Sequence, residues 1–326
     1  MKAPHLTRRR GFTLMELMVA MAITTIIVTV LVSITSIALD TWNRSRSELR
    51  ASRMGKMMVD YMARDLESLV TRRGNSNEWL SAIAIVDPEL SKIGSSSLNS
   101  TNASRLVFFT APTDRYDGNA GIPKLDDGGD VCCVAYTLDW KKPIQVAATE
   151  FKTFVLNRKL VDPNLTFSGN KKFKPLLGVT SSTNSLDSVF TADNYNLGII
   201  SNPANYTSEN IYQFSITFQV QVQVTDSSGT PPIVRTVTVP VAMGSNGTKS
   251  FRVLGTGILT DYSGPYKNEV ASGRVTAAMI SLTVLSDLAV DQIQEGKRKF
   301  ADDKAKAEFL AKNSYNFSKL VQLPGM

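Results

Sequence analysis

An uninterrupted apolar segment near the N-terminus constrains the fold of this chain more than any other feature. The segment runs for 28 residues from Phe12 to Leu39, and Glu16 is the only charged residue in it. About 20 apolar residues in a helix are enough to cross the hydrocarbon core of a bilayer. The segment therefore predicts a membrane-spanning helix, and the sequence contains no second segment of this kind.

A cleaved secretory signal is the alternative interpretation of this region, with Ser36, Ile37 and Ala38 as its cleavage site. The apolar stretch of such a signal is about 7–15 residues long, much shorter than the segment found here. A carboxylate inside hydrocarbon is also unfavourable by about 3 kcal/mol, and such residues are usually functional. The length of the segment and the position of Glu16 therefore favour a retained helix.

The residues where the apolar segment begins resemble the leader and processing site of type IV prepilins and type II secretion pseudopilins. The resemblance rests on three consecutive arginines, Gly11, Phe12, a Thr-Leu pair and Glu16. It implies that a prepilin peptidase cuts between Gly11 and Phe12, so that residues 1–11 form a removable leader. It also implies N-methylation of Phe12 and places Glu16 at the fifth position of the mature chain.

The same resemblance implies a role for Glu16 in filament assembly. Cleavage creates a positively charged amine on Phe12, whereas Glu16 lies one turn into the helix without an obvious partner in its own chain. In a stack of axially offset helices, Glu16 of one subunit can meet the Phe12 amine of its neighbour. An unpaired buried carboxylate is costly and a paired one is tolerated, so we expect Glu16 to align the incoming subunit.

The distribution of charge narrows the class of partner. The sequence has 36 Lys and Arg against 29 Asp and Glu, a formal net charge of +7, which raises nucleic acid or an anionic membrane as a partner. Four of the basic residues belong to the leader, and five others follow the apolar segment: Arg44, Arg46, Arg50, Arg53 and Lys56. We therefore expect a membrane partner and no nucleic acid. Because both flanks are basic, the leader motif decides the topology.

The single histidine, His5, lies within the leader. Ser-His-Asp and Cys-His catalysis and His-rich metal sites all require a histidine, so the mature chain is not expected to use them. The carboxylates Asp114, Asp117 and Asp127 could be imagined in a hydrolase, but no nucleophile motif accompanies them.

The stretch from Asp114 to Asp130 combines carboxylates with turn residues and could hold calcium. Its spacing does not fit an EF-hand, and Asp and Gly are also the ordinary residues of solvated turns. No cofactor is expected from the sequence.

Two adjacent cysteines, Cys132 and Cys133, lie in a predicted strand. Neighbouring residues of a strand point to opposite faces, and a disulfide between them would be strained. We predict two separately buried side chains.

An amphipathic segment continues the helix beyond the membrane. No proline occurs between Pro4 and Pro88, and apolar residues recur at helical spacing from Met54 to Leu69. We predict one helix from Phe12 to about Thr71, with residues 12–39 in the membrane and residues 40–73 as its soluble amphipathic half. The methionines of this stripe are interpreted as packing residues rather than as a copper site.

Residues 74–326 favour a β-rich extracytoplasmic domain. Strands are predicted at 105–110, 131–138, 214–224, 233–241 and 275–285, with the clearest alternation at 214–224. Ser/Asn-rich loops are predicted at 94–104 and 180–196, and a charged C-terminal helix over 287–312. The fold class is therefore α+β: a long N-terminal helix packed on an antiparallel β-rich domain, which is also the pilin-like architecture.

The stretch from Tyr61 to Leu66 resembles the region after the spine helix in J-type minor pseudopilins. The Ser/Asn-rich loops and the charged C-terminal helix depart from those proteins. Prepilin-like proteins of the Verru_Chthon cassette type, with larger β-rich domains, are a second resemblance.

These features predict a non-enzymatic pilin-like subunit, a minor pseudopilin of a type II secretion pseudopilus or of a type IV pilus-like filament. The resemblance implies four kinds of partner: a prepilin peptidase, other pilins or pseudopilins, an inner-membrane platform protein and an assembly ATPase. It implies a single pass through the bacterial inner membrane, with the C-terminal domain in the periplasm or outside the cell. A pilus-displayed adhesin or substrate-binding module and a membrane-tethered hydrolase remain as alternatives.

Overall fold

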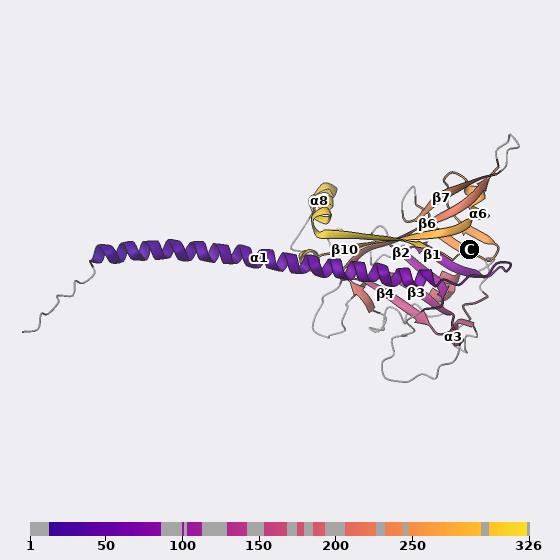
Figure 1. Cartoon of the computed structure of the whole chain (residues 1–326), viewed down its shortest axis with the longest axis horizontal. Coiled ribbons are helices and arrows are strands. Elements are labelled where there is room, and N and C mark those ends of the chain that lie inside the picture. Colours follow the sequence, from indigo (N-terminus) through magenta and orange to yellow (C-terminus); the bar gives the residue numbers. More distant parts are fainter. Residues whose placement is uncertain are drawn as a thin grey trace, which may run out of the picture. The chain divides into compact units, whose positions relative to one another are not determined.

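The structure is a computed structural model of the whole chain (Figure 1). It describes residues 13–85, 100, 103–112, 129–141, 153–167, 175–178, 185–192, 206–225, 232–243, 247–294 and 300–324. Contacts divide the chain into two compact units, Met1–Leu49 and Arg50–Met326.

The long helix α1 spans Leu14–Glu67 and contains the apolar segment. Among the described residues it is the one helix long and apolar enough to cross a membrane. The large apolar side chains from Leu14 to Leu39 are exposed, which is the arrangement that a lipid-facing helix requires.

The helix ends four residues before the predicted end at Thr71 because the chain enters a sheet there. The N–H of Val70 donates to the carbonyl oxygen of Phe109 at 2.9 Å, and Leu69 pairs with Thr110. These sheet contacts replace the next turn of helix.

A seven-stranded antiparallel sheet forms one part of the second unit, in the order β5-β4-β3-β2-β1-β8-β9. Its strands are β1 (Glu78–Ala84), β2 (Ser104–Thr110), β3 (Cys132–Lys141), β4 (Thr153–Val161), β5 (Tyr206–Glu209), β8 (Ser250–Leu254) and β9 (Gly257–Thr260). The strands predicted at 105–110 and 131–138 are confirmed as β2 and β3.

A four-stranded antiparallel sheet forms the other part, in the order β11-β10-β6-β7. Its strands are β6 (Ile211–Val224), β7 (Ile233–Val241), β10 (Arg274–Leu285) and β11 (Ser314–Gln322). Val224 is paired with Ile233, as expected for two strands joined by a turn. The three strands predicted at 214–224, 233–241 and 275–285 are therefore confirmed.

Asn210 carries the chain from one sheet to the other, between β5 and β6. Its φ of 62° is in the left-handed region, which asparagine tolerates better than most residues. The side chain accepts from Thr153 Oγ1 at 2.6 Å and donates to Asp287 Oδ1 at 2.7 Å. These bonds fix the crossing point between the sheets.

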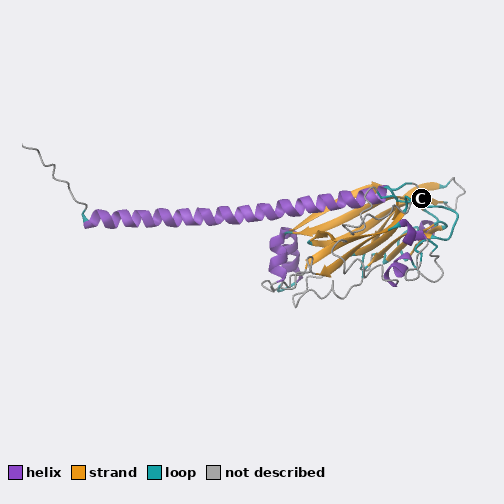
Figure 2. Ribbon diagram, turned by 90° about the horizontal axis from the view of Figure 1, so that it is seen from below, coloured by secondary structure: helices purple, strands orange, loops and turns teal. Residues whose placement is uncertain are grey.

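The main core lies where the second half of α1 meets strands of both sheets (Figure 2). Met58, Met62 and Leu66 of the helix are buried there, which confirms that this part of the methionine stripe packs into the core. Gly55 is also required at this contact, because a Cβ on it would lie 2.9 Å from Val284 Cγ2 and would overlap the ring of Phe317. The helix therefore approaches β10 and β11 closely.

A second apolar cluster covers the other face of the seven-stranded sheet. It includes Phe109, Cys133 and Phe190, whereas Cys132 belongs to the main core. The two adjacent cysteines thus lie on opposite faces, as predicted. Phe190 comes from helix α4 (Leu186–Ala192), so part of the Ser/Asn-rich segment predicted as an exposed loop is a helix packed on the sheet.

The segment predicted as one charged helix over 287–312 contains two helices, α7 (Asp287–Gln294) and α8 (Asp303–Asn313). A new helix begins because the side chain of Asp302 accepts from the N–H of Ala305 at 2.7 Å and caps it. Strand β11 then follows α8 directly. The described part of the chain also contains two five-residue helices, α3 (Pro163–Phe167) and α6 (Lys267–Ala271).

Candidate functional site

The first turn of α1 contains the part of the predicted processing and assembly site that the structure describes. Gly11 and Phe12 lie outside the described residues, and Glu16 lies in the first turn of the helix. The geometry of the site therefore begins at Thr13.

Thr13 and Glu16 form a reciprocal pair of caps at the start of the helix. Glu16 Oε2 accepts from the backbone N–H of Thr13 at 2.9 Å and from Thr13 Oγ1 at 3.0 Å. In return, the N–H of Glu16 donates to Thr13 Oγ1 at 3.2 Å. This is a capping box, in which the two residues satisfy backbone donors that the first turn of any helix leaves unpaired.

The capping box changes the expectation for Glu16. From the sequence alone Glu16 has no obvious partner within its own chain, whereas in the structure its carboxylate accepts hydrogen bonds from Thr13. The peptide N–H of Thr13 lies on the mature side of the predicted cut between Gly11 and Phe12. These bonds can therefore persist after cleavage.

Five hydroxyl groups in the apolar segment are satisfied within the helix itself. Each donates to the carbonyl oxygen four residues earlier, at 2.8–2.9 Å: Thr24, Thr25, Thr29, Ser33 and Thr35. A hydroxyl bonded in this way can lie in hydrocarbon without a partner from another chain. Glu16 therefore remains the residue of this segment that carries a charge.

A buried ion pair fastens the soluble half of α1 to the seven-stranded sheet. Asp65 of the helix accepts from Arg158 of β4, with Nε to Oδ2 at 2.8 Å and Nη2 to Oδ1 at 3.2 Å. Tyr136 of β3 donates its hydroxyl to Asp65 Oδ2 at 2.5 Å. The guanidinium of Arg158 also lies 5.0 Å from the ring centroid of Tyr61. The bidentate geometry fixes the register of α1 on the sheet.

Burial has a clear electrostatic effect in this cluster. The side chains of Asp65 and Arg158 are each 5% exposed. Burial, followed by the nearby Asp65 carboxylate, raises the pKa of Tyr136 well above its usual range. The phenol therefore stays protonated and remains a donor to Asp65.

A second set of charges ties α4 to the same sheet. Glu78 of β1 is fully buried, accepts from Arg252 of β8 and accepts from the N–H of Leu186 at 3.0 Å. Arg105 of β2 lies 3.2 Å from Asp187 of α4. Burial is the main cause that raises the pKa of Asp187, and repulsion from Glu78 adds to it, whereas Arg105 opposes the shift.

Replacing Asp187 with asparagine should change how stability depends on pH. Because the folded-state pKa of Asp187 is raised above 3.8, its contribution to stability is largest below the unfolded pKa and falls as pH rises through the folded pKa. As pH rises above about 4, the unfolding free energy of D187N should therefore increase relative to that of the unmodified chain. Denaturant unfolding at several pH values measures this difference.

Asp60→Asn is the matched control for this prediction. The hydrogen bond from Lys319 is the main cause that lowers the pKa of Asp60, so its contribution is present at neutral pH and is lost on acidification. As pH rises toward about 4, the unfolding free energy of D60N should therefore decrease relative to that of the unmodified chain, which is the opposite trend to that of D187N. A D187N curve that runs parallel to that of the unmodified chain would contradict the assignment.

Two other groups of residues, the Asp114–Asp130 stretch and the adjacent cysteines, were candidates for binding or reactivity. Most of the Asp114–Asp130 stretch, residues 113–128, lies outside the described residues, so the calcium hypothesis stays a prediction. Within the described part of the chain, no group of three or more His, Cys, Asp and Glu side chains could hold a metal ion. Burial strongly raises the pKa of the Cys133 thiol, which keeps it protonated.

Comparison with known proteins finds a match at the N-terminal site. Residues 6–32 match the family model described as the prokaryotic N-terminal methylation motif, which is the prepilin type. No curated protein and no solved structure matches the chain. The match includes Gly11, Phe12, Thr13 and Glu16.

The motif supports a type IV pilin-like protein, and the long N-terminal helix followed by an antiparallel β-rich domain is consistent with that fold. A prepilin-type N-terminus implies processing by a prepilin peptidase and assembly with other pilins. The single candidate membrane helix among the described residues fits a single-pass inner-membrane anchor.

Proposed function

We propose that this chain is a non-enzymatic minor pseudopilin, a subunit of a type II secretion pseudopilus or of a type IV pilus-like filament that serves protein secretion. The observation that carries the proposal is the methylation motif at residues 6–32, followed directly by the long apolar helix α1. An inner-membrane platform protein and an assembly ATPase are its further proposed partners. J-type minor pseudopilins and Verru_Chthon cassette proteins are the two groups that it resembles.

In this proposal each part of the chain has its own task. Residues 1–11 are a leader that is removed after Gly11, and Phe12 is then N-methylated. Residues 12–39 anchor the subunit in the inner membrane, and residues 40–73 link that anchor to the β-rich domain, residues 74–326. The domain lies in the periplasm or outside the cell, where it contacts neighbouring subunits or cargo.

Glu16 has two successive partners in this scheme. Before assembly, Thr13 provides two hydrogen bonds to its carboxylate. These bonds reduce the penalty of a carboxylate at the membrane boundary, but they do not neutralise its charge. The Phe12 amine of a neighbouring subunit does neutralise it, which favours the assembled state over the isolated one.

Mass determination of the mature N-terminus tests the proposal. When the full chain is produced together with a prepilin peptidase and purified in detergent, we expect a chain that begins at N-methylated Phe12. A Gly11→Val chain should keep its leader and begin at Met1, because the larger side chain blocks the cleavage position that the motif reserves for glycine. An unprocessed chain, or a cut after Ala38, would refute the proposal.

A further inference from the structure

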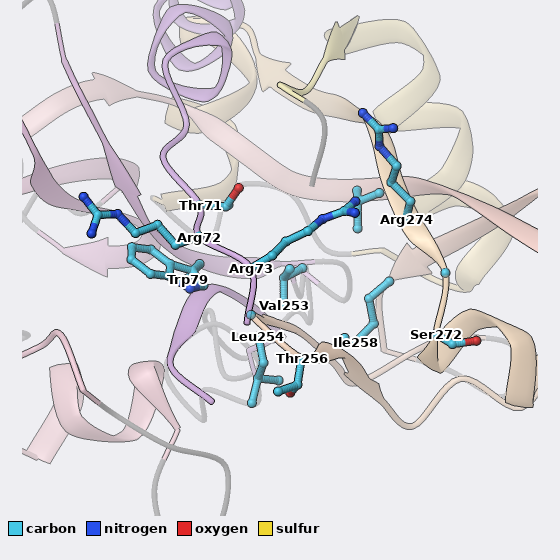
Figure 3. Close-up of a pocket in the computed structure, with 14 residues that line it drawn as sticks. Thr71, Arg72, Arg73, Trp79, Val253, Leu254, Thr256, Ile258, Ser272 and Arg274 are labelled. Atoms are coloured by element: carbon cyan, nitrogen blue, oxygen red, sulfur yellow. The ribbon is translucent and has the colours of Figure 1, made fainter. Parts of the chain in front are cut away.

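A cavity of about 350 Å³ lies at the seam between the two sheets (Figure 3). Three chain segments form its walls: residues 71–73 just after α1, residues 253–258 of the β8–β9 hairpin and residues 272–275 at the start of β10. Trp79 of β1 completes the lining. The volume is at the lower end of the range of small-molecule pockets in proteins.

Glycines hold these walls close together. A Cβ on Gly255 would lie 2.6 Å from the carbonyl oxygen of Arg72, and one on Gly273 would lie 2.6 Å from Val220 Cγ1. Gly257 has a φ of +148°, and a Cβ there would lie 2.6 Å from the carbonyl oxygen of Ala271. Side chains at these three positions would clash with Arg72, Val220 and Ala271, so the packing around the cavity requires glycine there.

Hydrogen bonds give the walls further support. The N–H of Gly74 donates to the carbonyl oxygen of Gly255 at 3.0 Å, and the N–H of Gly255 donates to that of Asn77 at 3.0 Å. The indole N–H of Trp79 donates to Asn75 Oδ1 at 3.2 Å. The segment after α1 and the β8–β9 hairpin are therefore fixed relative to each other, and the cavity is preformed.

The charged side chains among the described residues that line the cavity are cationic. Three arginines line it and, among the described residues, no aspartate or glutamate does. Figure 3 shows Arg72 and Trp79 at one end of the pocket and Arg73 and Arg274 at the other. Guanidinium groups match the geometry of carboxylate and phosphate, to which they donate two parallel hydrogen bonds.

We propose that this cavity binds a small soluble anion that carries two or more carboxylate or phosphate groups. The cations at both ends would hold separate anionic groups, while the apolar wall of Trp79, Val253 and Ile258 would contact the carbon skeleton between them. A concave site of this volume accommodates a molecule the size of citrate rather than a polymer. The proposal goes beyond the assembly function and does not depend on it.

Calorimetric titration of the full chain in detergent at low ionic strength tests the proposal. Citrate and inorganic phosphate are the probes, and glucose is the neutral control. We expect citrate to bind more tightly than phosphate, because it can reach both ends of the cavity, and glucose not to bind. Replacing Arg73 and Arg274 together with glutamine should weaken citrate binding by about tenfold or more.

Two further variants test whether the anion binds inside the cavity. Arg53→Gln removes an exposed arginine of the same charge outside the cavity and should leave citrate binding unchanged. Thr256→Trp places a bulky side chain at an exposed position of the cavity lining and should abolish binding without any change in charge. Thermal melting of each variant verifies that it is folded.

Several outcomes would overturn the proposal. Equal citrate binding by the R73Q/R274Q, R53Q and unmodified chains would mean that the cavity is not the site. Failure of the unmodified chain to bind either citrate or phosphate would exclude a small anion. Binding only to vesicles of phosphatidylglycerol would assign these arginines to a lipid surface instead.

Discussion

Replacing Asp65 with leucine should lower the free energy of unfolding by about 3–5 kcal/mol, because removal of one partner leaves the other as an uncompensated buried charge. That partner is Arg158, whose side chain is 5% exposed and which donates twice to Asp65. The hydroxyl of Tyr136 would lose its acceptor in the same change. Denaturant unfolding of the mature chain in detergent, followed by near-UV circular dichroism, measures the loss.

An exposed ion pair on the same helix provides the control. Asp60 accepts from Lys319 of β11 at 2.8 Å, but the two side chains are 46% and 39% exposed. Because water screens such a pair, D60N should change the unfolding free energy by about 1 kcal/mol or less. The contrast between D65L and D60N therefore isolates the effect of burial.

The double variant D65L/R158M tests the mechanism directly. Removal of both charges removes the buried unpaired cation, so the double variant should be more stable than D65L alone. Recovery should be incomplete because Tyr136 still lacks its acceptor. Losses that simply add, or a D65L chain as stable as the unmodified one, would show that Arg158 does not depend on Asp65.

The buried ion pair also has a consequence for the proposed function. A filament subunit is moved through its N-terminal helix, so any load on that helix reaches the β-rich domain through the contacts of α1. Asp65 provides a directional contact to β3 and β4 near the end of the helix, whereas Met58 and Met62 provide apolar packing. We therefore expect D65L to impair assembly into filaments more strongly than it impairs processing at Gly11.

Parts of the fold could be predicted because their signals are local. The apolar segment of α1 and the alternation of β6 are patterns that a few consecutive residues determine. Strand β4 was missed because Asn157, Arg158 and Lys159 interrupt its apolar residues and mimic a solvated stretch. The partner that neutralises Arg158 is Asp65, 93 residues away, and no local pattern identifies it.

The C-terminal region shows the opposite error. The charged segment after Asp287 reads as one continuous helix, and the break before α8 depends on one capping residue, Asp302. Strand β11 alternates in sequence, with Tyr315, Phe317 and Lys319 on one face, but this signal is short and follows a strong helical pattern. Its stability comes from nine paired positions on β10, which the sequence alone does not bring together.

The candidate sites divide in the same way. Gly11, Phe12 and Glu16 could be proposed from the sequence because they belong to one contiguous motif. The contribution of Thr13 was also available locally, since Thr-x-x-Glu is the signature of a capping box. The arginine-lined cavity could not be found, because Arg73 and Arg274 are brought together only by the packing of two sheets.

Replacing Glu16 with glutamine should abolish incorporation of the subunit into filaments while leaving leader removal and membrane insertion intact. Glutamine keeps a side-chain oxygen that can accept from Thr13, so the first turn of α1 remains capped. It has no charge, however, and cannot neutralise the Phe12 amine of a neighbouring subunit. A neutral side chain is also tolerated better in hydrocarbon, which removes a driving force for leaving the membrane.

Two companion variants distinguish the cap from the charge. Thr13→Ala removes the hydroxyl of the cap, keeps the carboxylate and should weaken the first turn by about 1 kcal/mol without preventing assembly. Glu16→Ala removes both the negative charge and the carboxylate oxygen that accepts from Thr13, and it should fail to assemble as E16Q does. The measurement is the fraction of each mature subunit recovered in sheared filaments from cells that contain the cognate assembly machinery, with the mature N-terminus verified by mass spectrometry.

The order of the three variants decides which partner of Glu16 matters for assembly. If charge pairing between subunits is the function, T13A assembles and both E16Q and E16A fail, even though E16Q preserves the cap better than T13A does. If capping is the function, E16Q assembles and T13A fails together with E16A, because loss of either partner breaks the capping box. Since the two mechanisms predict opposite results for T13A and E16Q, assembly of the E16Q chain at the level of the unmodified chain would exclude charge pairing.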